Sequence, residues 1–211
     1  MSERSVREKL EQPIVSSKYQ YAMDTVTNRL KLIGADLTEQ YRRPIIQNIS
    51  GRIKSAESIC KKLEKKKLEV SFNIAAEKLN DIAGVRAVCF FCDDIYCVAE
   101  ALRKQPDIRV IKEKDYVKRP KKSGYQSLHL IVEVDLSYNS YNNGTEKIRV
   151  EIQLRSFAMD YWAQLDNQMC YKKSAGEIEA IEREIRNYSA VMAEMDNRML
   201  ELRKRIEAAY V

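Results

Sequence analysis

Histidine is nearly missing from this chain, which has only His129 among its 211 residues. One imidazole cannot build a site that needs several, so the sequence excludes the multi-histidine metal hydrolases. The chain also has no uninterrupted apolar run long enough to cross a bilayer, and no basic and apolar leader at its N-terminus. We therefore expect a cytoplasmic protein without a membrane partner.

Cysteines are few, and their number is odd: Cys60, Cys89, Cys92, Cys97 and Cys170. An odd number of cysteines in apolar surroundings is typical of reduced thiols in a cytosolic protein, and it implies no disulfide framework. The CxxC spacing within residues 89–92 lies inside an apolar run and has no second pair, which argues against a metal site there.

The chain is basic, with 37 lysines and arginines against 31 acidic residues and a formal net charge of +6. This balance favours anionic partners such as nucleotides or RNA. The length fits one ordinary domain with an appendage, which is enough to bury a core.

The first part of the chain, residues 2–50, is predicted to be mostly helical, with breaks at Pro13 and Pro44 and a helix end at Gly34. Residues 51–67 predict an amphipathic helix with basic residues in its first turn, where free amides and cations suit phosphates. The lysine run at 61–67 either extends this basic surface or is an ordinary solvated helix face.

A buried strand is predicted over 85–91, a run rich in β-branched and aromatic residues, with Asp81 at its entrance. Arg86 lies within this apolar run and must find an anion or a carboxylate, because an unpaired buried guanidinium is costly. A helix over 93–104 and a short strand over 108–111 are expected to follow.

A basic loop, YVKRPKKSGY at 116–125, contains Pro120 and Gly124, which prevent a regular element. Its cations suit closure over phosphates, and a tyrosine ring beside them suits stacking on a base. The loop leads into a strand over 126–134, where His129 lies on the polar face with Ser127. Two interpretations of His129 remain open, a structural residue satisfied by its neighbours or a member of a site.

The strand predicted over 147–155, KIRVEIQLR, alternates apolar and polar residues. Glu151 and Gln153 project from the same side with cations around them, an arrangement that suits a polyanion and its metal. A solvated face of an antiparallel strand explains the same alternation. A polar hairpin loop at 137–145, with Asn143-Gly144 as its turn, precedes the strand.

Two helices are predicted after this strand. In the first, Phe157, Ala158, Tyr161, Trp162 and Leu165 recur at helical spacing and are expected to bury one face against the sheet, with Trp162 in the core. The second, over 177–210, has a heptad seam, which favours self-association but is also satisfied by packing on its own domain. The seam consists of Ile178, Ile181, Ile185, Tyr188, Met192, Met195, Met199, Leu202 and Ile206.

Several of these segments together resemble the synthetase domain of the Rel/SpoT alarmone enzymes. They are GRIKSAESI at 51–59, DIAGVR at 81–86, SGYQSLH at 123–129, EIQLRS at 151–156 and MDYW at 159–162, in the family's order and spacing. The likeness covers about residues 40–172, and the chain is similar to a small alarmone synthetase of the single-domain, oligomeric type.

The resemblance implies an α/β (α+β) fold with a nucleotidyltransferase-like mixed β-sheet flanked by helices. It divides the chain into an N-terminal helical segment (1–50), a catalytic domain (51–172) and a C-terminal oligomerisation helix (177–211). The implied enzyme is a GTP/GDP pyrophosphokinase that transfers the β,γ-pyrophosphate of ATP to the 3′-hydroxyl of GDP or GTP. The products are ppGpp or pppGpp and AMP, and the cofactor is Mg²⁺.

The same resemblance assigns roles to particular residues. Asp81 and Glu151 would be the catalytic and metal-binding pair, with Glu151 as the base. The ATP-side residues would be Arg52, Lys54, Ser58, Lys62 and Arg86. The GTP/GDP side would have Tyr125 stacked on guanine, together with Gln153, His129, Lys118 and Lys121.

The chain departs from the family at Asp166-Asn167, where many relatives carry a Glu-His pair. With one histidine and 211 residues it has no room for a histidine-rich hydrolase domain, so we expect synthesis without hydrolysis. One alternative is pyrophosphate transfer to adenine nucleotides or tRNA by the same fold. Another is a protein with an inactive site that binds single-stranded RNA, although an RNA binder has no use for two carboxylates among its cations. The resemblance favours a homo-oligomer, and a tetramer in particular.

Overall fold

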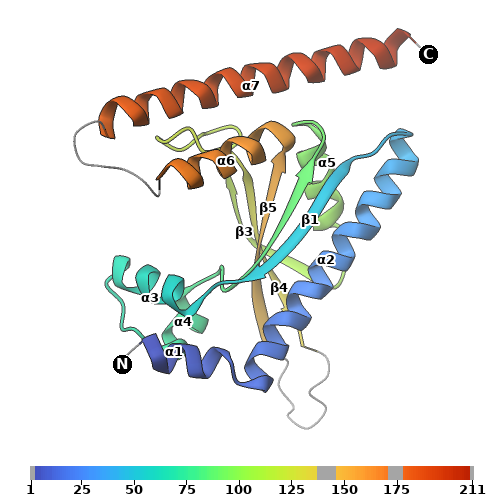
Figure 1. Cartoon of the computed structure of the whole chain (residues 1–211). Coiled ribbons are helices and arrows are strands. Elements are labelled where there is room, and N and C mark those ends of the chain that lie inside the picture. The colour runs from blue at the N-terminus through green and yellow to red at the C-terminus, as the bar shows by residue number, and fades with distance from the viewer. Residues whose placement is uncertain (1–2, 137–145, 171–177, 210–211) are drawn as a thin grey trace.

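The computed structural model of the chain describes residues 3–136, 146–170 and 178–209. At its centre is a five-stranded sheet in the order β1-β2-β5-β4-β3 (Figure 1). The β2–β5 pair is parallel and the other neighbours are antiparallel, so the sheet is mixed, as predicted. The strands are β1 (Ile46–Ile53), β2 (Ala83–Cys89), β3 (Ile108–Asp115), β4 (Leu128–Asp135) and β5 (Lys147–Ser156).

Helices pack on one face of this sheet and at its two ends. The long α2 packs across β1, β2, β4 and β5, with α5 beside it. In Figure 1, α6 and α7 lie at one end of the sheet, and α1, α3 and α4 gather at the opposite end. The helices are α1 (Glu3–Leu10), α2 (Pro13–Tyr41), α3 (Ala56–Lys65), α4 (Phe72–Lys78), α5 (Asp94–Arg103), α6 (Phe157–Cys170) and α7 (Ile178–Ala209).

The alternation predicted for β5 is confirmed. Val150, Ile152 and Leu154 have no exposed surface, and they join the core beneath α2. Each buried aliphatic side chain of this kind stabilises the fold by about 1.5–3 kcal/mol. Because side chains alternate along a strand, Glu151 and Gln153 project from the opposite face.

The helical prediction for residues 2–50 is wrong at its end, because residues 46–50 belong to the edge strand β1. Its sequence, IQNISGRI, contains a glycine and several polar residues, so the period of two is weak. Nor does α2 end at Gly34; it continues to Tyr41. A Cβ at Gly34 would lie 3.1 Å from Ile46 Cδ1, so the glycine allows α2 to approach β1 closely.

The helix predicted over 51–67 is shorter than expected and begins at Ala56. Ser55 is its N-cap, and its side chain accepts a hydrogen bond from the Ser58 amide. Arg52 therefore lies on β1, and Lys54 lies in the connection between β1 and α3. Both cations precede the helix instead of forming its first turn.

The amphipathic prediction for α6 holds only in part. Trp162 is buried, as predicted, and its Nε1 donates to the Ile185 carbonyl at 3.0 Å. The prediction that Phe157 and Tyr161 are buried is wrong, since these side chains are 59% and 52% exposed. They lie on the side of α6 that faces away from both the sheet and α7. The hairpin predicted at 137–145 falls outside the described residues.

Two different faces of α7 are in use. Ile185, Ser189 and Asp196 are buried against the rest of the protein. Other residues of the predicted seam are exposed: Tyr188, Met195, Met199, Leu202 and Ile206. The helix therefore packs on its own domain and still presents an apolar stripe. No helix in the described part of the chain is long and apolar enough to cross a membrane.

An ionic and aromatic cluster fixes the C-terminal half of α7. Arg203 donates to Asp93 at 2.6 Å, and Arg43 forms a bidentate pair with the fully buried Asp94 at 2.6 and 3.0 Å. Both guanidinium groups lie over the Phe91 ring, within 5.3 Å of its centroid. This cluster joins α7 to the segment after α2 and to the start of α5.

Candidate active site

The face of the sheet opposite α2 carries two rows of side chains. Residues paired across neighbouring strands project from the same face. In one row Arg52 pairs with Gly84, and Gly84 pairs with Glu151. In the next row the order is Ser50, Arg86, Gln153, His129 and Lys114. The register therefore brings residues from distant parts of the sequence onto one surface.

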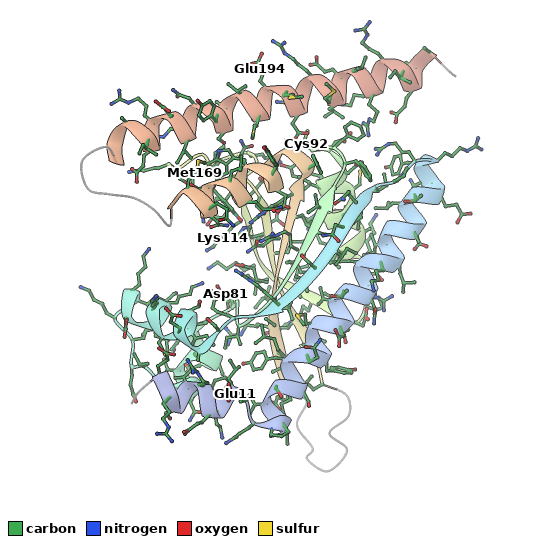
Figure 2. The ribbon with its side chains drawn as sticks, viewed as in Figure 1. Glu11, Asp81, Cys92, Lys114, Met169 and Glu194 are labelled. Atoms are coloured by element: carbon green, nitrogen blue, oxygen red, sulfur yellow. The ribbon has the colours of Figure 1, made fainter. Side chains whose placement is uncertain are left out.

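Asp81 lies just before β2, on the side of α3 and α4 (Figure 2). One carboxylate oxygen, Oδ2, accepts hydrogen bonds from the ammonium groups of Lys54 and Lys62. The other, Oδ1, is buried and has no hydrogen-bond partner among the described residues. Burial acts to raise the pKa of Asp81, but the two lysines outweigh it and hold the pKa below its ordinary value. The carboxylate is therefore ionised, and one of its oxygens has no partner among the described residues.

Glu151 belongs to a closed ring of hydrogen bonds. His129 Nδ1 lies 3.3 Å from Oε1, and Gln153 Nε2 donates to Oε2 at 2.8 Å. Arg155 completes the ring by donating to Gln153 Oε1 at 2.9 Å and to the Tyr125 hydroxyl at 2.8 Å. That hydroxyl lies 2.8 Å from His129 Nε2. The ring thus links the carboxylate to the tyrosine at the end of the basic loop.

One tautomer of a neutral His129 ring satisfies every hydrogen bond of this network. Arg155 is only a donor, so the Tyr125 hydroxyl accepts from it, and in the tautomer of His129 that carries its proton on Nδ1 the hydroxyl donates to Nε2. Nδ1 of the neutral ring then carries the proton and donates it to Glu151. Burial acts to raise the pKa of Glu151, but the contacts from His129 and Gln153 hold it below its ordinary value. The Asp81 charge acts in the opposite direction, so the two acids interact electrostatically.

Two residues of this site were not predicted from the sequence. Arg155 is only 4% exposed, and Asp160 of α6 accepts from it at 2.9 Å. The same Asp160 oxygen lies 3.3 Å from Arg86 Nη1. Asp160 is therefore the carboxylate that the half-buried Arg86 guanidinium was expected to have. The sequence pattern that could have identified Arg155 is the alternation along β5, because Arg155 follows Glu151 and Gln153 at every second position on its polar side.

An open cavity of about 260 Å³ lies beside these groups. Its walls are Ser50, Gly51, Arg52, Gly84, Val85, Arg86 and Gln153. Gly84 stands between Arg52 and Glu151 in the register, so this part of the floor has no side chain. The space is lined by backbone and cations, a composition that suits phosphate groups.

The basic loop contributes to the site unequally. Lys121 Nζ lies 4.5 Å from the centroid of the Tyr125 ring and 4.7 Å from that of Tyr116. Lys118 lies over Tyr96 and near Asp115, apart from the hydrogen-bonded ring around Glu151. Tyr125 also makes an edge contact with His129, with ring centroids 5.8 Å apart.

Known proteins match both the sequence and this fold. A family model described as a region found in RelA / SpoT proteins matches residues 51–176, which is more than half of the chain. The chain belongs to the RelA/SpoT family. The matched region runs from β1 into the segment after α6, and of the site residues described above only Ser50 lies outside it.

Individual RelA/SpoT relatives match almost the whole chain. The GTP pyrophosphokinase YwaC of Bacillus subtilis is 34% identical over 90% of this chain and 89% of its own length. The GTP pyrophosphokinase YjbM of the same organism is 32% identical over 90% of this chain and 88% of its own length. The fold is similar to the crystal structure of B. subtilis small alarmone synthetase 1 bound to its product pppGpp. That match has a TM-score of 0.79 and 33% identity, and it covers 89% of this chain and 94% of the other.

Most of the residues predicted from the RelA/SpoT motifs come together. Asp81, Lys54 and Lys62 form one cluster, and Glu151, Gln153, His129 and Tyr125 form the neighbouring ring. Ser58 is placed differently, since its hydroxyl accepts a hydrogen bond from Ser55 at 2.9 Å. The catalytic and binding roles of these residues stay predictions.

Proposed function

We propose that this protein is a GTP pyrophosphokinase that transfers the β,γ-pyrophosphate of ATP to the 3′-hydroxyl of GDP or GTP. The observation that carries the proposal is that two ionised carboxylates, Asp81 just before β2 and Glu151 on the neighbouring β5, interact electrostatically, with lysines bound to Asp81. Membership of the RelA/SpoT family and the names of YwaC and YjbM support the same activity. The products are ppGpp or pppGpp and AMP.

In the proposed reaction, Glu151 takes the proton of the 3′-hydroxyl as the oxygen attacks the β-phosphorus of ATP. The new oxygen–phosphorus bond forms while the bond from the β-phosphorus to the bridging oxygen of the α-phosphate breaks, and AMP leaves with that electron pair. A carboxylate with a low pKa is a weak base toward an alcohol, so its effect depends on exact placement. His129 and Gln153 provide that placement, because each holds one carboxylate oxygen.

The residues present fit a magnesium ion. The unpartnered Asp81 Oδ1 and the nearby Glu151 carboxylate are hard oxygen donors, which Mg²⁺ prefers, and phosphate oxygens complete such a site. We propose that these two residues hold the ion. When bound there, Mg²⁺ would neutralise phosphate charge.

The two nucleotides occupy different parts of the face. Arg52, Arg86 and the glycine floor at Gly84 form the cavity that we assign to ATP, with Lys54, Lys62 and Ser58 at the side of α3. The acceptor base stacks on Tyr125, where it takes the place of the Lys121 ammonium. Lys121 and Lys118 then remain close to the acceptor's phosphates. Crystal structures of B. subtilis small alarmone synthetase 1 with pppGpp and with AMPCPP support these two substrate classes.

We further propose a homo-oligomer assembled through the exposed seam of α7, with the tetramer favoured by family resemblance. Tyr188, Met195, Met199, Leu202 and Ile206 are each at least 46% exposed, a continuous apolar stripe that suits a second copy of the helix. Because the proposed substrates are cytoplasmic nucleotides, we place the protein in the cytoplasm.

The reaction is tested by incubating the purified protein with ATP, Mg²⁺ and GDP or GTP and separating the nucleotides by ion-exchange chromatography. We expect AMP together with a 3′-pyrophosphorylated guanine nucleotide, and no product when Mg²⁺ is chelated. Parallel reactions with ADP, ATP alone or tRNA as acceptor test the adenine and tRNA alternatives. Absence of AMP with every acceptor, together with retention of single-stranded RNA, would favour the RNA-binding function.

A further inference from the structure

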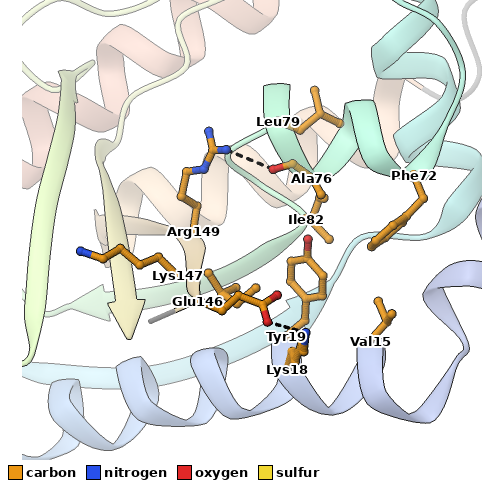
Figure 3. Close-up of a pocket in the computed structure, with 11 residues that line it drawn as sticks. Val15, Lys18, Tyr19, Phe72, Ala76, Leu79, Ile82, Glu146, Lys147 and Arg149 are labelled. Carbon is orange, nitrogen blue, oxygen red and sulfur yellow. Dashed lines mark hydrogen bonds and ion pairs between the residues drawn. The ribbon is translucent and has the colours of Figure 1, made fainter. Parts of the chain in front are cut away.

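Arg149 reaches from β5 to the segment immediately before Asp81. Its Nη1 donates to Asn80 Oδ1 at 2.7 Å, and its Nη2 donates to the carbonyl oxygens of Glu77 at 2.6 Å and Ala76 at 3.1 Å. Figure 3 shows the side chain extending from the strand to Ala76. The arginine therefore makes three hydrogen bonds to one short stretch of chain.

These contacts secure the end of α4. The helix ends at Lys78, and the last carbonyl groups of a helix have no partner within it. Arg149 satisfies two of those carbonyls and places its charge at the negative end of the helix dipole. The third bond holds Asn80, the residue directly before Asp81. On the other side of Asp81, the Ile82 carbonyl accepts from the Lys54 amide at 2.8 Å.

Asp81 is thus fixed through its neighbours as well as through its own lysines. Lys54 and Lys62 both bind Oδ2, and Oδ1 is left without a hydrogen-bond partner among the described residues. The direction of Oδ1 therefore depends on the position of the backbone at Asp81. Arg149 supplies an anchor on the preceding side. It is also two residues before Glu151 on the same face of β5, so one strand sets the positions of both carboxylates.

We propose that Arg149 is a positioning residue for Asp81, which keeps Oδ1 aimed at the metal bound with ATP. This inference rests on the proposed function and assigns Arg149 no contact with substrate. A residue that only completed a helix end would affect stability but not nucleotide binding by the folded protein. A positioning residue changes how strongly Mg²⁺ enhances ATP binding, because outer partners of a metal ligand typically contribute 10–100-fold to metal affinity.

The test is isothermal titration of the full-length protein with AMPCPP, in the presence of Mg²⁺ and in the presence of a chelator. We expect Arg149→Met to weaken binding about tenfold with Mg²⁺ and to leave the affinity without Mg²⁺ within about twofold of the wild type. Asn80→Ala removes only one of the three bonds, and we expect a smaller loss of the same kind. The double variant should lose less than the two single losses combined, because both remove one interaction.

The matched control is Lys147→Met, since Lys147 lies two residues earlier on the same face of β5 and is exposed. It should bind AMPCPP as the wild type does under both conditions. Thermal unfolding of each variant establishes that it is folded at the titration temperature. If Arg149→Met is not folded, Asn80→Ala decides the question.

The positioning role would be overturned if Mg²⁺ enhanced AMPCPP binding by folded Arg149→Met as strongly as by the wild type. When only Asn80→Ala folds, the same result in that variant would overturn it. Either result would leave the proposed function intact. No enhancement by Mg²⁺ in the wild type itself would overturn the metal-dependent reaction and, with it, this inference. The two failures are therefore distinguishable in one series of titrations.

Discussion

The Ser189 hydroxyl donates a buried hydrogen bond of 2.6 Å to the main-chain carbonyl of Gly124. Ser189 belongs to α7, and Gly124 lies in the basic loop directly before Tyr125. The Trp162 indole attaches the same part of α7 to α6 through the Ile185 carbonyl. The long C-terminal helix therefore supports the loop that precedes Tyr125, on the acceptor side of the proposed site. This support is separate from any role of the helix in assembly.

Replacing Gly124 with alanine should displace this loop. Gly124 has φ +92°, where side chains are strained, and an added Cβ would lie 2.7 Å from Ser189 Cβ. Because Tyr125 must move with its neighbour, we expect the KM for GDP or GTP to rise about tenfold while AMPCPP affinity stays unchanged. Initial rates at varied acceptor concentration and AMPCPP titrations measure the two effects.

The matched variant for this prediction is Ser189→Gly. Combined with Gly124→Ala it removes the two Ser189 atoms that lie within 3.0 Å of the new Cβ, so the rise in acceptor KM should be partly reversed while the backbone strain remains. Ser189→Ala keeps the Cβ and should restore nothing. An unchanged KM in Gly124→Ala would show that the loop does not depend on its contact with α7.

Glu151→Gln tests the assignment of the base. The amide has nearly the same shape, but it cannot take the hydroxyl proton, so we expect kcat to fall by about 100- to 10,000-fold. One of the hydrogen bonds from His129 and Gln153 is lost, because an amide has only one acceptor oxygen. Because Glu151 is also a proposed Mg²⁺ ligand, the comparison uses AMPCPP in the presence of a chelator and GDP, and both should give dissociation constants within about threefold of the wild type. A kcat near that of the wild type would remove Glu151 from the role of base.

The parts of the fold that were predictable from sequence are those with a local pattern. The alternation along β5 identified both its buried side and the face that carries Glu151 and Gln153. The edge strand β1 was missed because only one of its neighbours is a strand, so most of its residues are exposed and the period of two is lost. Exposure of Phe157 and Tyr161 was missed because helical spacing shows that residues share a side, but not which side another element covers.

The site itself depends on contacts that no local pattern contains. Asp81 and Glu151 come together because β2 and β5 pair in parallel, although 70 positions separate the two acids. Before the structure, only the resemblance to a family connected them. Arg155 and Asp160 illustrate the same limit. Asp160 contacts both Arg155 and Arg86, and these contacts can be recognised only when α6 is placed beside the sheet.

The exposed seam of α7 is tested more cleanly by substitution than by removing residues 177–211, because deletion would also remove the support of Trp162 and Gly124. Met195 and Leu202 lie seven residues apart on the exposed stripe. We expect Met195→Lys with Leu202→Lys to give a smaller assembly by multi-angle light scattering, since charges would replace an apolar contact.

Glu194→Gln with Glu201→Gln is the control, because it also changes the net charge by +2 but lies beside the stripe. This variant should keep the wild-type mass. Thermal unfolding of the lysine variant at low concentration should stay close to that of a wild-type protomer, since the substituted side chains are exposed. An unchanged mass in the lysine variant would mean that copies associate elsewhere.

A buried carboxyl group lies on the face of α7 that packs against the rest of the protein. Asp196 is 7% exposed and accepts a hydrogen bond from Ser156. Its Oδ2 has no hydrogen-bond partner among the residues described, and the same holds for Oδ1 of the neighbouring Asp93. Burial raises the pKa of Asp196, the Ser156 hydroxyl opposes this rise, and the Asp93 charge adds to it. The charged form is therefore destabilised in the folded protein.

This raised pKa predicts a specific pH dependence of stability. Below the ordinary carboxyl pKa, Asp196 is protonated in both the folded and the unfolded state and has no effect, but as pH rises through the raised value the folded state loses stability. Asp196→Asn keeps an acceptor for Ser156 and has no charge to bury. We therefore expect it to raise Tm at pH 7, by roughly 2–4 °C per kcal/mol gained. The difference should shrink toward pH 4, whereas the exposed Glu201→Gln should show no such trend, and a pH-independent difference for Asp196→Asn would assign the gain to packing instead of charge.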